Sequence, residues 1–490
     1  MRTLLSASAA AAPAAWLEKT TAVVDGIDAW VWGWPMIVVL LATGLLYTIW
    51  LRFLPLRFLL HGFRHTFRRE QGAKGEVSNF ASLCTALATT IGTGNIVGVA
   101  TAIGTGGPGA LFWMEVAAIL GMATKYAEGL LAIRYREVTP EGRVIGGPFQ
   151  YIEKGLGRRW RPLAVAFSVF GICAGLFGLG TFVQVNGITS AVMRVCDPAF
   201  NPADPATGVP LFGTTYSAYV IATGAVVTLA VAAVIIGGLK RIAVVASVVV
   251  PVMAVFYIVV CLVLILGHID ALPGACMDIV RGAFNPAAVG GGAVGTFFVA
   301  LQRGVSRGIF SNEAGLGSAP IASAVAQTHE PVHQGLISMT GVFLDTTVVC
   351  TLTGLAIVVM GSWKPELGLQ GVDITLAAFA KGLPFGGRIA EIVLMVSLVF
   401  FAYTTTLGWT FYSEKCLEYL VGVRRRWPVA VLRALFILAV AAGPYFTVSI
   451  VWGCADIFSG LMAFPNLLAL IVLSPVVVKC TREYFGKARE

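Results

Sequence analysis

The chain has 490 residues, of which 57% are hydrophobic and only 12% are charged. An average soluble protein carries about twice this share of charge, ~25%, and a soluble chain of this length would need charged surfaces on several domains. The composition therefore excludes a soluble enzyme, a disordered protein and a nucleic-acid-binding protein. Nine cysteines without a C-x-x-C pair favour neither a zinc ribbon nor a disulfide framework.

Long apolar segments recur along the whole chain. A membrane-crossing helix needs about 20 mostly apolar residues. By that criterion the candidate spans are approximately 31–52, 80–104, 109–134, 162–193, 216–237, 242–267, 291–324, 334–361, 386–420, 429–447 and 450–479. The sequence thus predicts an all-α polytopic membrane protein with about 11 transmembrane helices.

Most of the 34 Lys and Arg residues lie in alternate loops between these spans. The basic loops are 52–76, 134–161, 240–241, 424–426 and the chain from 479 onward. Since cytoplasmic loops are enriched in Lys and Arg, we predict an N-terminus outside and a C-terminus in the cytoplasm, in the cell (inner) membrane. The first 15 residues faintly resemble a signal peptide, and the sequence leaves their cleavage open.

Three short matches to enzyme motifs lack the structural context that their chemistry needs. Residues 329–333 read H-E-x-x-H, but Pro331 disfavours the continuous helix on which such a zinc site depends. Residues 304–308 read G-x-S-x-G without a parallel sheet to carry a nucleophile elbow. Residues 92–98 resemble a dinucleotide loop outside any βαβ unit. We therefore predict no catalytic residues.

Two of the predicted spans are interrupted by glycine and polar residues. The first interruption is 89–95, T-T-I-G-T-G-N, and the second is 310–320, F-S-N-E-A-G-L-G-S-A-P. Polar backbone is tolerated inside a membrane only where it faces protein or a wet cavity, and the freed helix ends there can bind ions and zwitterions. The alternative reading is close glycine-mediated helix packing.

The two interruptions lie at matching positions of two five-helix runs. Because five is odd, the second run starts on the opposite side of the membrane, which is the arrangement of an inverted repeat with a site at the repeat interface. We therefore predict four segments. They are 1–78, with the outside segment, the first span and a basic loop, 79–270 and 290–482, the two repeats, and 483–490, a cytoplasmic tail.

Charged side chains inside the predicted spans are costly in lipid and are usually paired or functional. For Lys125 and Glu128, three residues apart on one helix, we expect a structural ion pair. Glu313 lies inside the second interruption, so we expect it to belong to a site or gate. Asp345 lies in the eighth span without an assigned role.

The ninth predicted span carries three consecutive threonines at 404–406. Their hydroxyls could complete the oxygen shell of a small hard cation beside freed carbonyls. Alternatively, each threonine could bond back to its own helix.

Several stretches resemble the alanine or glycine:cation symporter family of the LeuT-type superfamily. They are ATTIGTGNIVGVATAIGTGGPGALFWM (88–114), GMATKYAE (121–128), GGPFQYIEKGLG (146–157), FSNEAGLGSAPIA (310–322), GVFLDTTVVCTLTGL (341–355) and, more weakly, TTTLGWTFYSEKC (404–416). The resemblance implies one N-terminal helix followed by a five-plus-five inverted repeat with two broken helices. It also implies import of small neutral amino acids, chiefly alanine or glycine, coupled to Na⁺ or, less commonly, to H⁺.

Site residues can be carried over by position. The resemblance implies that substrate contacts Thr90, Ile91, Gly92, Thr93 and Gly94, with Gln184, Asn312 and Trp409 as further wall residues. It implies a cation site formed by Ala88, Ile91, Thr404 and Thr405, with a register ambiguous by one residue. No cofactor and no metal other than Na⁺ is expected, and the partners would be the amino acid, Na⁺ and the lipid bilayer. Glycines at 92 and 94 would let the backbone approach the ligand, so we expect Gly94→Ala to abolish transport.

This chain departs from the family pattern at Glu115, where tryptophan is usual, and at Phe149, Gln150 and Ser323. Glu115, together with Glu313, is a candidate gating or coupling residue, and the alternative is a partly exposed glutamate without a role. An H⁺-coupled transporter of a related amino acid is therefore the main alternative function. A channel would need a continuous polar pore, and a membrane enzyme would need a nucleophile or metal pair at membrane depth.

Overall fold

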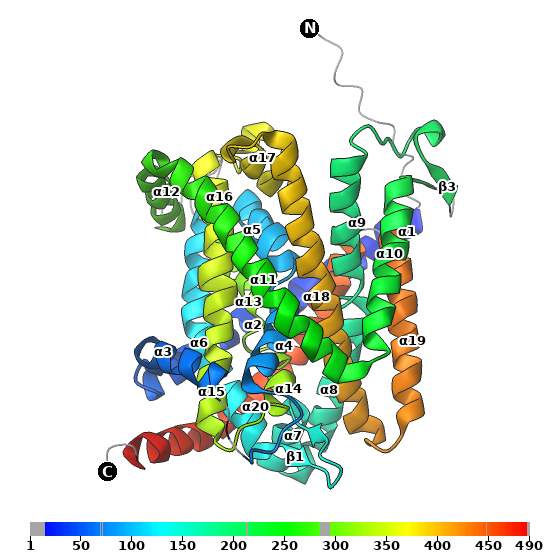
Figure 1. The fold of residues 1–490 in the computed structure, drawn as a ribbon. Helices are drawn as coiled ribbons and strands as arrows, with labels where there is room; N and C mark the ends of the chain where they lie inside the picture. Colours follow the sequence, from blue (N-terminus) through cyan, green and yellow to red (C-terminus); the bar gives the residue numbers. More distant parts are fainter. Residues whose placement is uncertain are drawn as a thin grey trace.

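The computed structural model describes residues 15–487, apart from 69, 71, 212–213, 285–294 and 447. The signal-peptide-like stretch lies, except for Ala15, outside the described residues. The described chain forms a bundle of long helices, and its strands form two short antiparallel hairpins (Figure 1). The predicted all-α class is confirmed.

The first part of the chain contributes twelve α-helices. They are α1 (Ala15–Val31), α2 (Trp34–Trp50), α3 (Leu54–Phe67), α4 (Asn79–Thr90), α5 (Val99–Gly106), α6 (Gly109–Tyr135), α7 (Pro148–Gln150), α8 (Arg161–Phe177), α9 (Phe182–Cys196), α10 (Ala218–Ile235), α11 (Gly238–Gly267) and α12 (Leu272–Phe284). The hairpins pair β1 (Glu137–Val138) with β2 (Val144–Ile145), and β3 (Val209–Leu211) with β4 (Thr214–Tyr216).

The second part contributes the remaining helices. They are α13 (Gly295–Asn312), α14 (Ala319–Ala324), α15 (Pro331–Val342), α16 (Thr351–Met360), α17 (Val372–Gly382), α18 (Gly387–Val421), α19 (Arg426–Ala442) and α20 (Val448–Lys487). Short π-helical turns occupy Gly94–Gly98, Tyr151–Gly155 and Phe343–Cys350. Short 3₁₀ turns occupy Arg158–Trp160, Pro205–Thr207, Ile269–Ala271, Pro365–Leu367 and Gly443–Tyr445.

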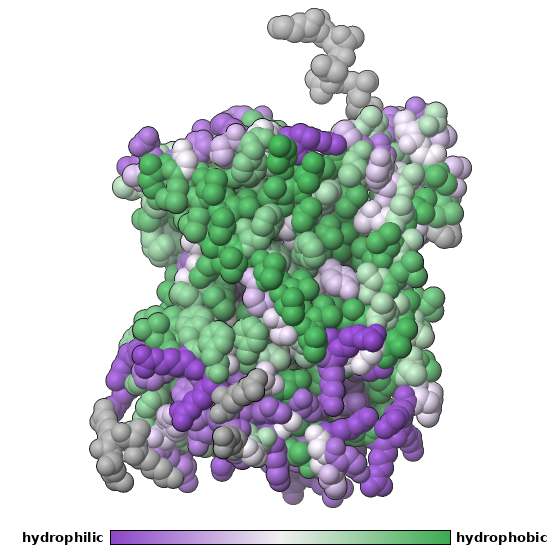
Figure 2. Space-filling view, in the orientation of Figure 1, coloured by the Kyte–Doolittle hydropathy of each residue, from purple (hydrophilic) through white to green (hydrophobic). Residues whose placement is uncertain are grey.

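The bundle has two distinct ends. At one end, here called the basic end, lie α3, β1, the loop between α18 and α19 and the C-terminal part of α20 (Figure 1). At the opposite end lie α12, α17 and β3 (Figure 1). Figure 2 shows a hydrophobic band between two hydrophilic ends, as expected for a protein whose middle faces lipid.

The helices correspond closely to the predicted spans. Among the described residues nine helices are long and apolar enough to cross a membrane, and the bent pair of α4 with the chain from Gly94 to Gly106 would be a tenth. The predicted seventh span, 291–324, corresponds to α13 and α14, which are separated by a non-helical stretch and do not pass this test. The total of 11 therefore stays a prediction.

Both predicted interruptions are confirmed as breaks in helices. The axis bends by 50° between α4 and the helix that resumes at Gly94, and Ile91 is extended, with φ −77° and ψ 91°. The second break follows α13, where Glu313, Gly315 and Gly317 have φ values of 56°, 86° and 83°. A positive φ is strained for a residue with a Cβ, so Glu313 must be held by its surroundings.

The short helix α3 packs on α15 at the basic end. A Cβ added to Gly62 would lie 2.3 Å from the Leu336 carbonyl oxygen, so only glycine permits this approach. The His65 ring stacks on the His333 ring at 4.0 Å, and His333 Nδ1 lies 2.6 Å from a Glu70 carboxylate oxygen. Burial, and then the neighbouring His333 and Arg68, lower the pKa of His65 to about 4.

This lowered pKa predicts an acid-sensitive contact between α3 and α15. Because the folded pKa lies below the ordinary 6.5, His65 contributes stability above pH 6.5 that is lost as the pH falls toward about 4. We expect the melting temperature of the wild-type protein in detergent to fall more steeply over this range than that of His65→Gln. His61, His333, Glu70 and Arg68 also surround this ring, so an equally steep fall in both proteins would assign the acid sensitivity to those neighbours.

Candidate functional site

The first helix break exposes backbone groups in the centre of the bundle. The Gly92 N–H donates to Oδ1 of Asn95 at 2.8 Å, so it does not continue the helix by donating to the Ala88 carbonyl. The Thr93 N–H donates to Oε1 of Gln184 on α9 at 3.3 Å. The structure thus brings the predicted Gln184 against the predicted glycine-rich break.

The threonine run on α18 meets this break through one of its members. Thr405 Oγ1 lies 3.4 Å from the Ile91 carbonyl oxygen and 3.0 Å from the Phe401 carbonyl oxygen. Thr404 Oγ1 lies instead 3.6 Å from Sδ of Met253 on α11. Both hydroxyls also bond back to their own helix. Of the two, Thr405 therefore faces the predicted cation site directly, together with the Ile91 carbonyl.

Glu313 connects both breaks to α18. Its Oε1 accepts a hydrogen bond from Nε1 of Trp409 at 3.0 Å. Its Oε2 accepts hydrogen bonds from Ser318, within the second break, and from Thr89, at the end of α4, the latter at 3.4 Å. All four side chains are buried. The predicted Glu313 and Trp409 therefore contact each other, and the hydrogen bond between Glu313 and Thr89 joins the two breaks.

A second polar cluster, which the sequence did not assign to the site, surrounds Asp345. Asp345 Oδ1 accepts a hydrogen bond from Nδ2 of Asn95 at 2.7 Å. Asp345 Oδ2 accepts hydrogen bonds from Ser311 at 2.9 Å and from Thr346 at 2.8 Å. Asp345 is fully buried, and this oxygen-rich cluster at the break is suited to a hard cation. The available signal was an acidic residue inside an apolar span.

Other predicted residues have structural partners. Asn312 donates to Oγ1 of Thr346 at 3.1 Å and accepts from the Ala314 N–H at 2.9 Å. Glu115 accepts a hydrogen bond from Thr351 at 2.7 Å, between α6 and α16. Thr90 is buried and lines a small cavity between α4, α14 and α15. The assignment of these residues to substrate or gating stays a prediction.

The expected ion pair between Lys125 and Glu128 is wrong. Within the described part of the chain neither side chain forms an ion pair within 4 Å, although both are buried. Glu128 instead accepts hydrogen bonds from Asn466 on α20, at 2.7 Å, and from the Gly317 N–H, at 3.2 Å. Residues three apart on a helix are neighbours, but only Glu128 has hydrogen-bond partners here, and the Lys125 ammonium has none among the described residues.

A cavity of about 740 Å³ reaches the first break from the opposite end of the bundle. Thr93 and Gly98 line it near the break, and Arg307 and Trp452 line it from α13 and α20. Arg307 forms an ion pair with Asp456 at 3.1 Å and lies over the Trp452 ring. From this end the cavity therefore reaches Thr93, one of the predicted substrate residues.

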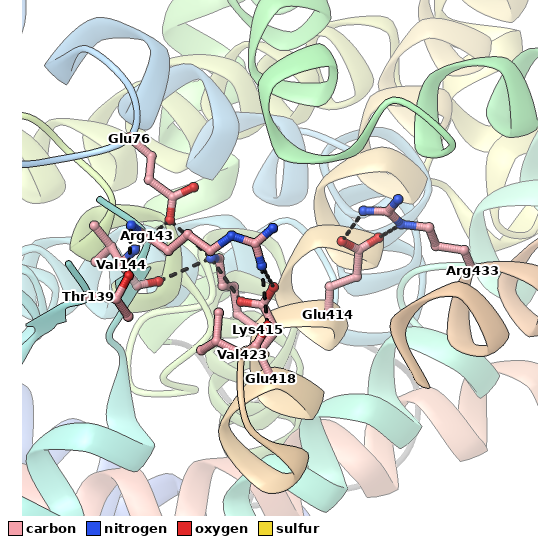
Figure 3. A network of polar contacts seen from close by, with 9 residues as sticks. All are labelled: Glu76, Thr139, Arg143, Val144, Glu414, Lys415, Glu418, Val423 and Arg433. Carbon is pink, nitrogen blue, oxygen red and sulfur yellow. Dashed lines mark hydrogen bonds and ion pairs between the residues drawn. The ribbon is translucent and has the colours of Figure 1, made fainter. Parts of the chain in front are cut away.

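At the basic end a network of charged side chains links the chain before α4 to α18 (Figure 3). The Lys415 ammonium lies 3.1 Å from Glu76, 3.0 Å from Glu418 and 3.1 Å from the Val144 carbonyl oxygen. Glu76 also accepts a hydrogen bond from the Val144 N–H at 2.8 Å. Lys415 is only 5% exposed, and this latch, Glu76–Lys415–Glu418, holds the two segments together beside a cavity of about 630 Å³ that the three side chains line.

The enzyme-like motifs do not form enzyme sites. His329 precedes α15, which begins at Pro331, so the two histidines do not share a continuous helix. Ser306 lies within α13 and not at a strand-to-helix turn. Among the residues that the structure describes, no three His, Cys, Asp or Glu side chains are placed to hold a metal ion.

A helical bundle with two helices broken at its centre defines the class of protein. The crystal structure of MhsT in complex with L-phenylalanine matches this structure with a TM-score of 0.55, at 14% identity, over 84% of this chain and 99% of MhsT. The fold is therefore that of the LeuT-type secondary transporters, and the protein is a membrane transporter and not an enzyme.

The sequence places the chain within one family of such transporters. The model of the sodium:alanine symporter family matches residues 17–490. The sodium/alanine symporter AgcS of Methanococcus maripaludis is 43% identical over 94% of this chain and 96% of AgcS. An uncharacterized transporter of Haemophilus influenzae is 50% identical over 95% of this chain and 96% of that protein. The protein belongs to the sodium:alanine symporter family, as its resemblance implied, and catalyses cation-coupled amino-acid symport.

The geometry of the first break predicts unequal effects at its two glycines. A Cβ on Gly92 would lie 2.5 Å from Oγ1 of Thr405, whereas a Cβ on Gly94 would meet Ser311 at an ordinary 3.4 Å. We expect Gly92→Ala to reduce uptake by about fivefold or more, since overpacking of this kind costs about 1–3 kcal/mol. Gly94→Ala, which the sequence suggested as the disruptive change, is expected to have the smaller effect. Initial uptake rates of the two folded variants compare them, and a larger loss in Gly94→Ala would contradict the geometry.

The latch at the basic end predicts a conformational change on removing its cation. Lys415→Met leaves Glu76 and Glu418 without their shared ammonium, so the chain before α4 should separate from α18. We expect faster hydrogen exchange in peptides covering residues 76–90. Lys479→Met is the matched control, because its ion pair with Glu483 is long, at 3.9 Å, and both side chains are exposed. Unchanged exchange in Lys415→Met would show that other contacts keep this end closed.

Proposed function

We propose that this protein imports small neutral amino acids, alanine or glycine, together with Na⁺. The observation that carries the proposal is the meeting of the Thr405 hydroxyl and the Ile91 carbonyl beside the glycine-rich break. Oxygen atoms from a hydroxyl and from freed carbonyls suit a small hard cation, and the N–H groups of the same break suit the carboxylate of an amino acid.

The proposed cation site lies between α4 and α18. Its ligands are the carbonyl oxygens of Ala88 and Ile91 and the hydroxyls of Thr404 and Thr405, with Thr405 the most direct. Asp345, with Ser311 and Asn95, offers a second set of oxygen atoms across the break. A carboxylate in that position also supports H⁺ as an alternative coupling ion, since a buried acid can bind a proton in place of Na⁺.

The proposed substrate site lies next to the cation site. The backbone of Gly92, Thr93 and Gly94 would bind the carboxylate, with Gln184 beside it. Trp409 is held by Glu313 at 3.0 Å and would limit the length of the side chain. A site closed by this indole and by Ile91 favours alanine or glycine over larger amino acids.

The transport direction follows from the proposed orientation. Since basic residues favour the cytoplasm, we assign the basic end to the cytoplasm and the opposite end to the outside. The 740 Å³ cavity would then admit substrate and Na⁺ from outside, and the latch would hold the chain before α4 against α18 at the cytoplasmic end. Opening of the latch would complete the exchange between outward and inward states.

Uptake of labelled L-alanine into proteoliposomes tests this function. We expect accumulation with an inward Na⁺ gradient, and little with choline replacing Na⁺. Excess glycine should compete, and excess leucine should not. Accumulation driven by a proton gradient without Na⁺ would replace Na⁺ by H⁺ as the coupling ion. Absence of alanine uptake under both gradients would overturn the proposed substrate.

The two threonines provide a sharper test of the cation site. Thr405→Ala removes the hydroxyl beside the Ile91 carbonyl, so the Na⁺ concentration for half-maximal uptake should rise about tenfold, as for loss of one charge-assisted ligand. Thr404→Ala removes a hydroxyl that faces Met253, so this variant should raise the Na⁺ concentration for half-maximal uptake less. Thr405→Ser, which keeps the hydroxyl, should retain the wild-type value. Equal Na⁺ dependence in all three variants would contradict the site.

A further inference from the structure

The helix α3 exposes an apolar surface beside a row of arginines. Leu56, Leu60 and Phe67 are 59%, 75% and 71% exposed. Arg57 and Arg64 alternate with them along the helix and are also exposed. Among the described residues neither arginine forms an ion pair within 4 Å, so their charges are uncompensated by protein. An apolar face next to unpaired arginines is typical of a helix that lies in the interface of a membrane.

The position of α3 agrees with that description. The helix lies across the edge of the bundle and not along the long helices (Figure 1). In the space-filling view hydrophilic atoms cover this region where the hydrophobic band ends (Figure 2). Lipid headgroups meet a membrane protein at this level, and long arginine side chains reach them while their stems stay in the apolar layer.

The opposite face of α3 contacts α15 and the segment that precedes it. Gly62 packs directly on α15, as described above. Glu70, just after α3, accepts hydrogen bonds from the His329 N–H at 2.7 Å and from Thr328 at 2.9 Å. The segment with these two residues joins α14, the second half of a broken helix, to α15. A ligand that holds α3 in the interface therefore also restrains α14 and α15.

We propose that α3 is a docking site for anionic phospholipids in the leaflet at the basic end, and that occupancy of this site accelerates transport. Arg57 and Arg64 would bind the headgroup phosphate by charge-assisted hydrogen bonds. Leu56, Leu60 and Phe67 would contact the acyl chains. Charge complementarity favours an anionic headgroup over the zwitterionic phosphatidylcholine, which carries no net charge.

Lipid binding is tested first without reference to transport. Purified protein is titrated with phosphatidylglycerol or phosphatidylcholine and examined by native mass spectrometry. We expect the wild type to retain more phosphatidylglycerol than phosphatidylcholine, and Arg57→Gln/Arg64→Gln to lose this preference. The matched control is Arg424→Gln/Arg425→Gln, which removes two exposed charges from the α18–α19 loop at the same end. Equal phosphatidylglycerol binding by all three proteins would overturn the site.

The effect on transport is tested in proteoliposomes. We expect uptake by the wild type and by the control to be several-fold faster in vesicles with a quarter phosphatidylglycerol than in phosphatidylcholine alone. Arg57→Gln/Arg64→Gln should show equal rates in both, and Arg57→Lys/Arg64→Lys should recover the difference. If the Gln variant keeps the dependence, the lipid acts elsewhere and the proposal fails. The binding experiment remains decisive whichever amino acid the protein carries.

Discussion

The architecture of the site depends on one buried carboxylate, that of Glu313. Its backbone is left-handed, a conformation that costs a residue with a Cβ about 1–3 kcal/mol. Its two oxygens repay this cost by hydrogen bonds to Trp409, Ser318 and Thr89. These partners come from α18 and from both broken helices. The carboxylate therefore links the end of α4 and the second break to α18.

The two ends of the bundle differ in structure. At the opposite end, the cavity of about 740 Å³ extends to Thr93 at the first break. At the basic end, the latch of Glu76, Lys415 and Glu418 holds the chain before α4 against α18 (Figure 3). The centre between them has fully buried side chains with mutual hydrogen bonds, such as Asp345 with Asn95.

Much of this fold could be predicted from the sequence, because apolar length and glycine content act locally. Ten of the predicted spans coincide with helices or helix pairs that pass as membrane spans, and both breaks lie where glycine and polar residues interrupt them. The rotation of each helix about its axis was not predictable, because it depends on packing between distant segments. For this reason the sequence could not decide between Thr404 and Thr405. The sequence also suggested a pair of Lys125 with Glu128. In the structure Glu128 instead accepts a hydrogen bond from Asn466, which is 338 residues away along the chain.

The π-helical turn Phe343–Cys350 has a consequence for how this site can change over time. A π-helical turn holds one residue more than the α-helical turns around it, as a single insertion would produce. The extra residue changes the helical register between α15 and α16. The face that α15 presents to α3 is therefore set separately from the face that α16 presents to α17. Loss of one residue here would rotate everything on one side by about 100° and carry Asp345 or its partners away from Asn95. A point substitution leaves this register unchanged, whereas a change of chain length by one residue alters it.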